Sequence, residues 1–231
     1  MKRFWKQVSV AEGDGGWRVL LDGRAIKSQG GQAQVLPTRA VAELVAGEFA
    51  AQGEEVDPRS FVFRDMADYA IDVLPKDREA TLAKLLTYAE TDTLCYRAAP
   101  DEPLFARQEE LWEPLVAACE ARHDMVLQRA SGIMHRPQPA ASIAALRKRL
   151  EGEDDFTLAA LLNMVSLAAS LVVGLAMLEV GADAEALFAA ANAEEDWQAE
   201  LWGSDWEAEK VRAIRLEAFG KAAEFAAAVR A

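Results

Sequence analysis

The chain has 231 residues, of which 52% are hydrophobic and 27% charged, with a formal net charge of −13. This length and composition predict one large folded domain or two small ones and exclude a disordered chain. The acidic balance argues against nucleic acid and anionic lipid as partners, because both require a basic surface.

The first third of the chain is typical of short strands. Apolar residues alternate with other residues at Val8 and Val10, and again at Trp17 and Val19, on either side of a glycine-rich loop. This period of two predicts two strands. Asp22-Gly23 then predicts a tight hairpin, since Asp-Gly accepts the positive φ angles of a two-residue turn.

A helix and two short strands complete this β-rich segment. A strand over residues 34–36 ends at Pro37, and Thr38 caps a helix that stops at Gly53. Residues 61–63 are apolar throughout and are interpreted as one more short strand.

From about Pro75 onward the apolar spacing is helical. Pro114 lies inside the predicted helix 103–122 and is expected to kink it or to start a second segment. Ser204 to Glu207 form a capping box that opens the last helix. The remaining predicted helices cover residues 82–89, 143–150, 156–178 and 183–203, and the apolar stripe of the last one is Val211, Ile214, Ala218, Ala222, Phe225 and Val229. The fold class is therefore α+β, with a β-rich α/β domain at 1–73 and a helical bundle at 74–231.

Residues 156–178 contain no charged side chain and are long enough to span a bilayer. Asn163, Ser166 and Ser170 interrupt the segment, and both of its flanks are acidic, whereas cytoplasmic flanks of membrane spans carry Lys or Arg. A buried central helix of a bundle explains the segment better, and we expect no stable membrane insertion.

The acidic residues are concentrated in one segment. Residues 151–209 contain 14 Asp or Glu and no Lys or Arg, which leaves 24 acidic and 25 basic residues in the rest of the chain. Charge alone favours a solvated surface that maintains solubility. The alternative is a docking surface for a less acidic protein partner.

Motifs for catalysis or metal binding are missing from the sequence. His123 and His135 have no metal-ligand spacing, Cys95 and Cys119 form no C-x-x-C pair, and no phosphate loop or nucleophile elbow occurs. We therefore expect no catalytic residue, metal or cofactor, and we expect buried, reduced thiols in a chain without an export signal. The alternative is an enzyme of unfamiliar type that uses carboxylates such as Asp92 or Glu113 in an interdomain pocket.

One acidic and tryptophan-bearing stretch stands out near the C-terminus. On a helix, Glu194, Gln198 and Trp202 are spaced by four and share a face, and Trp197 lies on the neighbouring face. These residues are either core tryptophans with solvated acids or an interface with a tryptophan anchor and carboxylates that accept hydrogen bonds from Arg or Lys.

Several ordered strings resemble one known family. They are Arg3-Phe4-Trp5-Lys6, Gly15-Gly16-Trp17, Leu21-Asp22-Gly23-Arg24, Leu36-Pro37-Thr38-Arg39-Ala40, Ala51-Gln52-Gly53-Glu54, Thr91-Asp92-Thr93-Leu94-Cys95-Tyr96-Arg97, Arg107-Gln108, Trp112-Glu113-Pro114, Glu195-Asp196-Trp197-Gln198 and Trp202-Gly203. Together they are similar to the ATP synthase assembly chaperone family that binds the alpha subunit of the catalytic F-one sector, found in mitochondria and in some bacteria.

The resemblance implies a function and a fold. Members bind unassembled alpha subunit and prevent its aggregation until the beta subunit replaces them, and their fold is an α/β piece followed by an orthogonal helical bundle. It implies a monomeric, non-enzymatic chaperone of the bacterial cytoplasm, whose eukaryotic relatives lie in the mitochondrial matrix.

The resemblance also implies which residues contact the partner. Family function depends on an acidic residue at the start of the Glu-Glu-Asp-Trp-Gln stretch, which corresponds here to Glu194, with Glu195 as the next candidate. Gln198 and Trp202 share this surface, and Phe49 stands where the family usually has tryptophan. We expect Glu194→Lys to weaken client holding with little change in the thermal midpoint.

Overall fold

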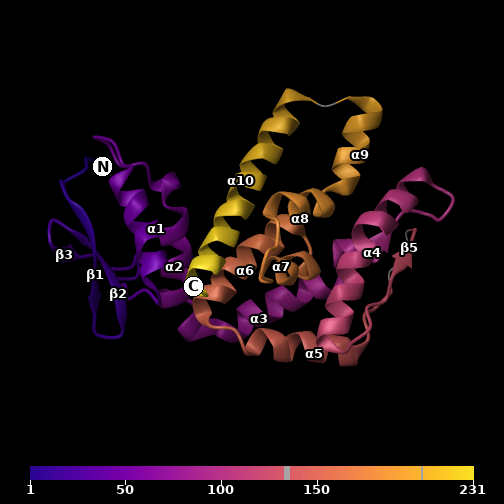
Figure 1. The fold of residues 1–231 in the computed structure, drawn as a ribbon, viewed down its shortest axis with the longest axis horizontal. Coiled ribbons are helices and arrows are strands. Elements are labelled where there is room, and N and C mark those ends of the chain that lie inside the picture. Colours follow the sequence, from indigo (N-terminus) through magenta and orange to yellow (C-terminus); the bar gives the residue numbers. More distant parts are fainter. Residues whose placement is uncertain (133–135, 204) are drawn as a thin grey trace. The chain divides into compact units, whose positions relative to one another are not determined.

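The computed structural model describes residues 1–132, 136–203 and 205–231. Its elements follow the chain as three strands, three helices, a helix between two further strands, and then a run of helices (Figure 1). The strands are β1 Val8–Gly13, β2 Gly16–Leu21, β3 Arg24–Ala25, β4 Tyr96–Arg97 and β5 Ala130–Ser131. The helices are α1 Arg39–Ala50, α2 Val62–Asp72, α3 Leu74–Glu90, α4 Pro103–His123, α5 Ala140–Glu151, α6 Asp155–Ala168, α7 Leu171–Met177, α8 Ala184–Ala191, α9 Ala193–Trp202 and α10 Trp206–Val229. The predicted α+β fold class is confirmed.

The N-terminal strands form an antiparallel sheet in the order β1-β2-β3. Asp22 and Gly23 connect β2 to β3 with φ angles of 49° and 79°, which confirms the predicted turn and fits its two positive φ angles. The predicted strand at 34–36 is a single bridge, in which Leu36 exchanges two backbone hydrogen bonds with Trp17 at 2.8 and 2.9 Å.

Residues 61–63 do not form the predicted strand. Phe61 precedes α2, and Phe63, Met66 and Ala70 are buried at a helical spacing of three and four. The carboxylate of Glu48 accepts the backbone N–H groups of Phe63 and Arg64 at 2.7 and 2.9 Å, and so caps the start of α2 from another helix. An apolar run of three residues cannot reveal a cap that lies in a different helix.

Contacts along the chain divide it into two compact units. The first comprises Met1–Arg78, Asp154–Ala160 and Lys221–Ala231, and the second comprises Glu79–Glu153 and Leu161–Gly220. The first boundary falls next to Asp77, where α3 departs from helical geometry (φ −145°, ψ 48°). The sequence-based boundary between residues 73 and 74 stays a prediction.

Each unit has its own apolar core. In the first, Val19, Val41 and Val45 are fully buried, and the rings of Phe63 and Phe225 stack at 6.4 Å. In the second, the largest fully buried side chain is Trp112 of α4, whose indole N–H donates to the carbonyl of Ala190 at 2.7 Å. α4 continues through Pro114 as one helix, so the predicted alternative of a second segment is wrong.

Residues 156–178 form two helices, not the single one that was predicted. α6 ends at Ala168, Ala169 adopts a positive φ of 48°, and Ser170 caps α7. Leu158, Leu161 and Val173 are fully buried, as the central-helix interpretation requires. Within the described residues, no helix combines the length and hydropathy needed to cross a membrane.

The C-terminal segment departs from the prediction at two further points. The helix predicted from 183 to 203 breaks at Asn192 into α8 and α9, and Asn192 donates from its amide to the carbonyl of Phe188. On α10, Phe225 is buried as predicted, but Val211 and Ile214 are more than half exposed. The proposed capping box begins at Ser204, which lies outside the described residues, as does His135.

Candidate protein-binding surface

α9 and the first half of α10 lie side by side as a helical hairpin. Arg212 of α10 binds Asp196 of α9 through two hydrogen bonds of 2.8 and 2.7 Å. One turn along, Arg215 pairs with Glu195 at 3.3 Å. Planar guanidinium groups that contact both carboxylate oxygens fix orientation as well as distance, so these pairs define how α9 lies against α10.

α4 contacts the other side of α9. Arg107 binds both oxygens of Glu200 at 2.7 and 2.8 Å, and its guanidinium lies 5.7 Å from the centre of the Trp197 ring. The fully buried Gln108 accepts the backbone N–H of Ala98 at 2.8 Å and donates to Glu194 at 2.6 Å. The string Arg107-Gln108 thus connects α4 to α9 directly.

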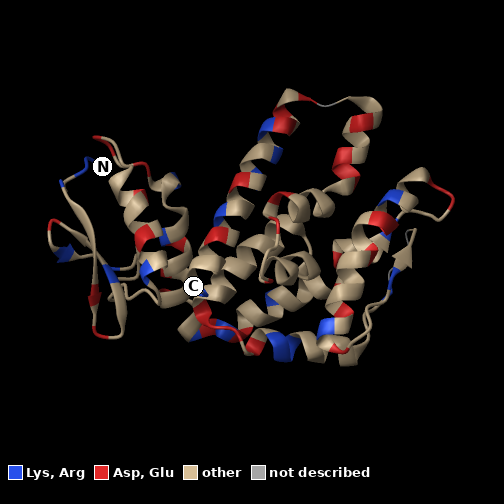
Figure 2. Ribbon diagram, in the orientation of Figure 1, with Lys and Arg blue, Asp and Glu red and all other residues tan. Residues whose placement is uncertain are grey.

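These contacts correct the prediction that the carboxylates of this stretch are available for Arg or Lys of a partner. Glu195, Asp196 and Glu200 all pair with arginines of the same chain, so α9 is not a set of unpaired carboxylates awaiting a basic partner. Red residues predominate on α9, whereas both signs occur along α10 (Figure 2). The arginines come from α4 and α10, outside the acid-only segment, so counting charges within that segment could not reveal them.

The hairpin exposes an unusual set of large apolar side chains. Trp202 is 78% exposed and Trp206 is 72% exposed, on either side of the connection between α9 and α10. We call the exposed apolar residues of this hairpin the hairpin apolar group; its members are Leu201, Trp202, Trp206, Val211 and Ile214. Scattered exposed apolar residues are ordinary, but two tryptophans and three aliphatic residues gathered on one helical hairpin are typical of a protein-interaction surface.

The structure places four of the five predicted partner-binding residues on α9. Glu194, Glu195, Gln198 and Trp202 are exposed. Phe49 instead lies in the core of the first unit, and is only 6% exposed. Its ring contacts those of Trp5 and Phe61 at centroid distances of 5.5 and 4.7 Å, so its position serves packing of the first unit and lies apart in the sequence from the residues of α9.

Glu194 has a structural bond that the sequence could not show. Because its carboxylate accepts a hydrogen bond from buried Gln108, Glu194→Lys would leave that amide donor unsatisfied. The earlier expectation of an unchanged thermal midpoint is therefore replaced: we expect Glu194→Lys to lower stability as well as to alter the surface.

The two carboxylates that the enzyme alternative named are occupied by structural bonds. Asp92 is fully buried and accepts hydrogen bonds from Ser170 Oγ at 2.7 Å, from Val172 N at 2.9 Å and from Leu94 N at 3.1 Å. Burial raises the pKa of Asp92 to about 6 even though these donors oppose the rise. Its position explains the break between α6 and α7, because it binds the first residues of α7.

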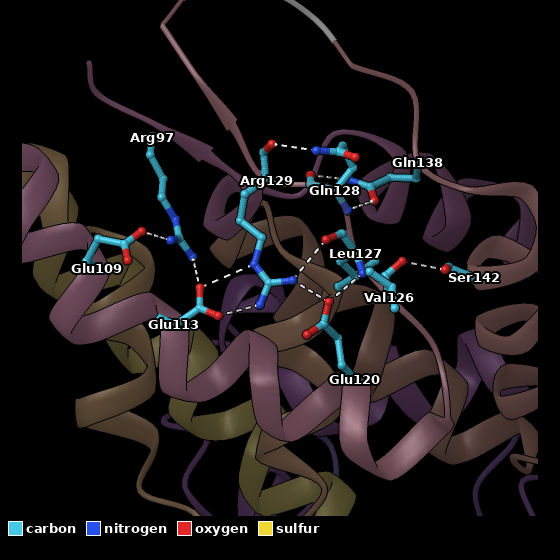
Figure 3. Close-up of polar contacts among 10 residues, drawn as sticks. All are labelled: Arg97, Glu109, Glu113, Glu120, Val126, Leu127, Gln128, Arg129, Gln138 and Ser142. Atoms are coloured by element: carbon cyan, nitrogen blue, oxygen red, sulfur yellow. Dashed lines mark hydrogen bonds and ion pairs between the residues drawn. The ribbon is translucent and has the colours of Figure 1, made fainter. Parts of the chain in front are cut away.

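Glu113 belongs to a network that holds β4 and β5 against α4 (Figure 3). It accepts from Arg97 of β4 at 2.7 Å and from Arg129, just before β5, at 2.6 Å. Arg129 also pairs with Glu120 and donates to the carbonyl of Leu127. The hydrogen bonds from Arg129 lower the pKa of Glu113, so this carboxylate stays charged and bound rather than available as a base.

The remaining candidate groups within the described residues are two cysteines and His123. Among the residues that the structure describes, no cluster of His, Cys, Asp and Glu could hold a metal ion. Cys95 and Cys119 are free and buried, and burial raises the pKa of each thiol to about 12. Burial lowers the pKa of His123.

Comparisons with known proteins give the family. The model of the ATP12 chaperone protein family matches residues 2–120. Over 215 residues the chain is 26% identical to the mitochondrial protein atp12 of Schizosaccharomyces pombe, covering 88% of this chain and 74% of that protein.

Solved structures agree over almost the full length. The chain superposes on Atp12 from Paracoccus denitrificans with a TM-score of 0.92 at 36% identity, covering 99% of this chain and 98% of that one. It superposes on the Atu1473 protein from Agrobacterium tumefaciens with a TM-score of 0.93 at 36% identity, covering 98% and 85%. This chain is a member of the ATP12 chaperone family.

Proposed function

We propose that this member of the ATP12 family binds the unassembled alpha subunit of ATP synthase, prevents its aggregation, and yields it to the beta subunit. Membership of the family supports a role as a chaperone in ATP synthase assembly. The identity of the client, a monomeric state and a bacterial cytoplasmic location are part of the proposal. A non-enzymatic mechanism follows from it.

The observation that carries the proposal is the hairpin apolar group. An isolated subunit of an obligate complex exposes an interface that resembles a core cut in half, and such surfaces aggregate when bare. Trp202 and Trp206 offer large rigid rings for contact with that surface. The carboxylate of Glu194 lies exposed on the same helix, one turn before Gln198, where it accepts hydrogen bonds from client Arg or Lys.

The pairing of the α9 carboxylates suits a chaperone that must release its client. Arg107, Arg212 and Arg215 hold α9 in place before any client arrives, so little conformational entropy is lost when the client binds. The arginine pairs also lower the net charge that α9 presents to the client. We therefore infer that binding relies on a few apolar anchors, which the larger interface of the beta subunit displaces by mass action.

No specific observation favours the enzyme alternative. Asp92 and Glu113 are fixed by hydrogen bonds to their own fold, as described above. A chaperone surface is therefore the function that the described residues support best.

Co-expression with the alpha subunit tests the proposal. We expect the alpha subunit to stay soluble and to co-purify with this chain. The double variant Trp202→Ala/Trp206→Ala should no longer retain the alpha subunit. If either ring is an interface anchor, its affinity for the alpha subunit should fall by about 30-fold or more. Val126→Ala/Val180→Ala provides a matched control, because both valines are exposed apolar residues of the same unit outside the hairpin.

The outcome of this experiment separates three failures. Loss of the alpha subunit from both variants would indicate general destabilisation. Retention by the double tryptophan variant would remove the hairpin from the account, and insoluble alpha subunit beside the unaltered chain would reject the client assignment.

A further inference from the structure

The first unit contains an apolar pocket that the proposed function does not use. Its volume is about 320 Å³, at the lower end of the roughly 300–1,000 Å³ of sites that enclose small ligands. Trp5, Leu21, Phe49 and Phe61 contribute its buried apolar walls. Phe4 lines it as well and is 73% exposed, so one aromatic ring already lies in solvent at this site.

The charged residues that line this pocket are all basic. They are Arg24, Lys27 and Arg64, and no described Asp or Glu is among the lining residues. Arg64 is partly neutralised by Asp68 at 3.4 Å and lies over the rings of Phe49 and Phe61. Arg24 and Lys27 are exposed, and neither forms an ion pair with a described residue, although the neighbouring carboxylate of Asp22 interacts electrostatically with Arg24.

This combination is notable on so acidic a chain. The chain carries 38 acidic residues against 25 Lys and Arg, yet the charged side chains that line this apolar pocket are all cationic. A large apolar side chain would gain free energy by burial against Trp5 and Phe61. A carboxylate next to that side chain would gain charge-assisted hydrogen bonds from Arg24 or Lys27.

We propose that this pocket is a second protein-binding site, which takes one large apolar side chain from an extended segment of a partner whose neighbouring residues are Asp or Glu. Charge complementarity argues for this occupant: the apolar walls accept the large side chain, and exposed Arg24 of β3 and Lys27 just after β3 complement the acidic residues that flank it. The site lies wholly within residues 1–64 and does not depend on the assignment of the alpha subunit as client.

Peptide binding to the intact chain tests the site directly. The probe is a short fluorescent peptide with a single phenylalanine between Asp and Glu residues, and binding is measured by fluorescence anisotropy. Two companion peptides replace the acidic residues by lysine or the phenylalanine by serine. We expect binding of the acidic aromatic peptide alone, with an affinity that falls as salt is added.

Matched charge reversals on the chain complete the experiment. Arg24→Glu/Lys27→Glu should lower the affinity for the acidic peptide by about tenfold or more, which corresponds to ~1.4 kcal/mol. Arg59→Glu/Lys76→Glu makes the same change in net charge at exposed residues of the same unit outside the pocket, and should leave affinity within about twofold. Phe4→Ser tests the apolar contact without altering charge.

Three results would overturn the proposal. One is equal binding of the acidic and lysine peptides, and another is an equal effect of the two charge-reversed variants. The third is self-association of the unaltered chain that Arg24→Glu/Lys27→Glu abolishes while no peptide binds, since a second copy would then be the occupant.

Discussion

At the scale of single residues, buried polar side chains decide where helices end and which surfaces face outward. Asp92 binds the start of α7, Gln108 links Ala98 to Glu194, and Glu48 caps α2. Each of these groups is buried or half-buried with hydrogen-bonding partners distant in sequence. A buried polar group of this kind is costly to leave unpaired, so each should be sensitive to changes that preserve shape but alter donors and acceptors.

Asp92→Asn should lower the free energy of unfolding by about 1–3 kcal/mol, because the new amide N–H₂ faces a donor, either Val172 N–H or the Ser170 hydroxyl. The effect should also depend on pH. In the folded chain the pKa of Asp92 is raised to about 6, so between pH 4 and 6 the folded state holds a proton that the unfolded state has lost. Chemical denaturation across this range measures the effect.

The sign follows from the direction of that pKa change. The contribution of Asp92 to stability is fully present below pH 4 and is lost as pH rises through 6, by on the order of 2–3 kcal/mol. Burial also raises the pKa values of Glu48, Asp65 and Asp68, so the difference between the unaltered chain and Asp92→Asn isolates one residue. This account would be contradicted if the free energy of unfolding of the unaltered chain, relative to that of Asp92→Asn, increased as the pH is raised.

Glu194→Gln should separate the charge of this residue from its structural bond. The amide oxygen of glutamine still accepts from Gln108, so the thermal midpoint should change little, while any hydrogen bond from a cationic client group should weaken by about 1–2 kcal/mol. Glu185→Gln is a matched control, because Glu185 is an exposed acid in the first turn of α8, as Glu194 is in α9. Equal client retention by the two variants would show that the charge of Glu194 is not used.

At the scale of elements, helices were easier to predict than the places where they break. Leu82, Leu85 and Leu86 are buried as the period of α3 requires, and the Asp22-Gly23 hairpin forms as predicted. Periodicity shows only which face of an element is apolar. It is sufficient here because the local residues of these elements determine where they form. The small sheet and the helix after Thr38 were predictable for the same reason.

The errors occur where a partner distant in sequence sets the outcome. Asp92 binds Ser170, 78 residues further along the chain, where the predicted helix 156–178 is interrupted. Glu48 caps the start of α2, where a strand was expected. The candidate site follows the same pattern. Exposed Trp202 lies on the predicted helix, whereas the exposure of Val211 and Ile214 depends on which face of α10 the rest of the fold covers, and the helical period alone does not show this.

Gly174 of α7 permits close packing against α6. A Cβ atom added there would overlap Val165 Cγ2 and lie 3.0 Å from Leu161 Cδ1. Alanine should gain about 1 kcal/mol of helix propensity, but overpacking against a fully buried, β-branched valine should cost about 1–3 kcal/mol. We therefore expect Gly174→Ala to lower the free energy of unfolding, as measured by denaturant titration.

Two further variants test that balance. Gly47→Ala in α1 has open space around the added Cβ and should be stabilising by up to about 1 kcal/mol. Adding Val165→Ala to Gly174→Ala should show favourable coupling, because the overlapping methyl group is removed. Gly174→Ala that is as stable as the unaltered chain would mean that the α6–α7 contact is not tight.

At the scale of the whole molecule, the chain combines two compact cores with one hairpin that exposes apolar side chains. Its strong negative charge does not produce a bare acidic surface on α9, because arginines from α4 and α10 pair with that helix. The exposed tryptophans are then the feature that distinguishes the hairpin from an ordinary solvated surface. Membership of the ATP12 family supports a chaperone role in ATP synthase assembly, and we propose that this hairpin is the surface that holds the client subunit.

Amide hydrogen exchange of the chain, alone and in complex with the alpha subunit, measures this central claim most directly. We predict that client binding slows exchange in α9 and in the first half of α10, over residues 193–214, where the exposed backbone and side chains become covered. Unchanged exchange over these residues, with protection confined to other parts of a stable complex, would contradict the account.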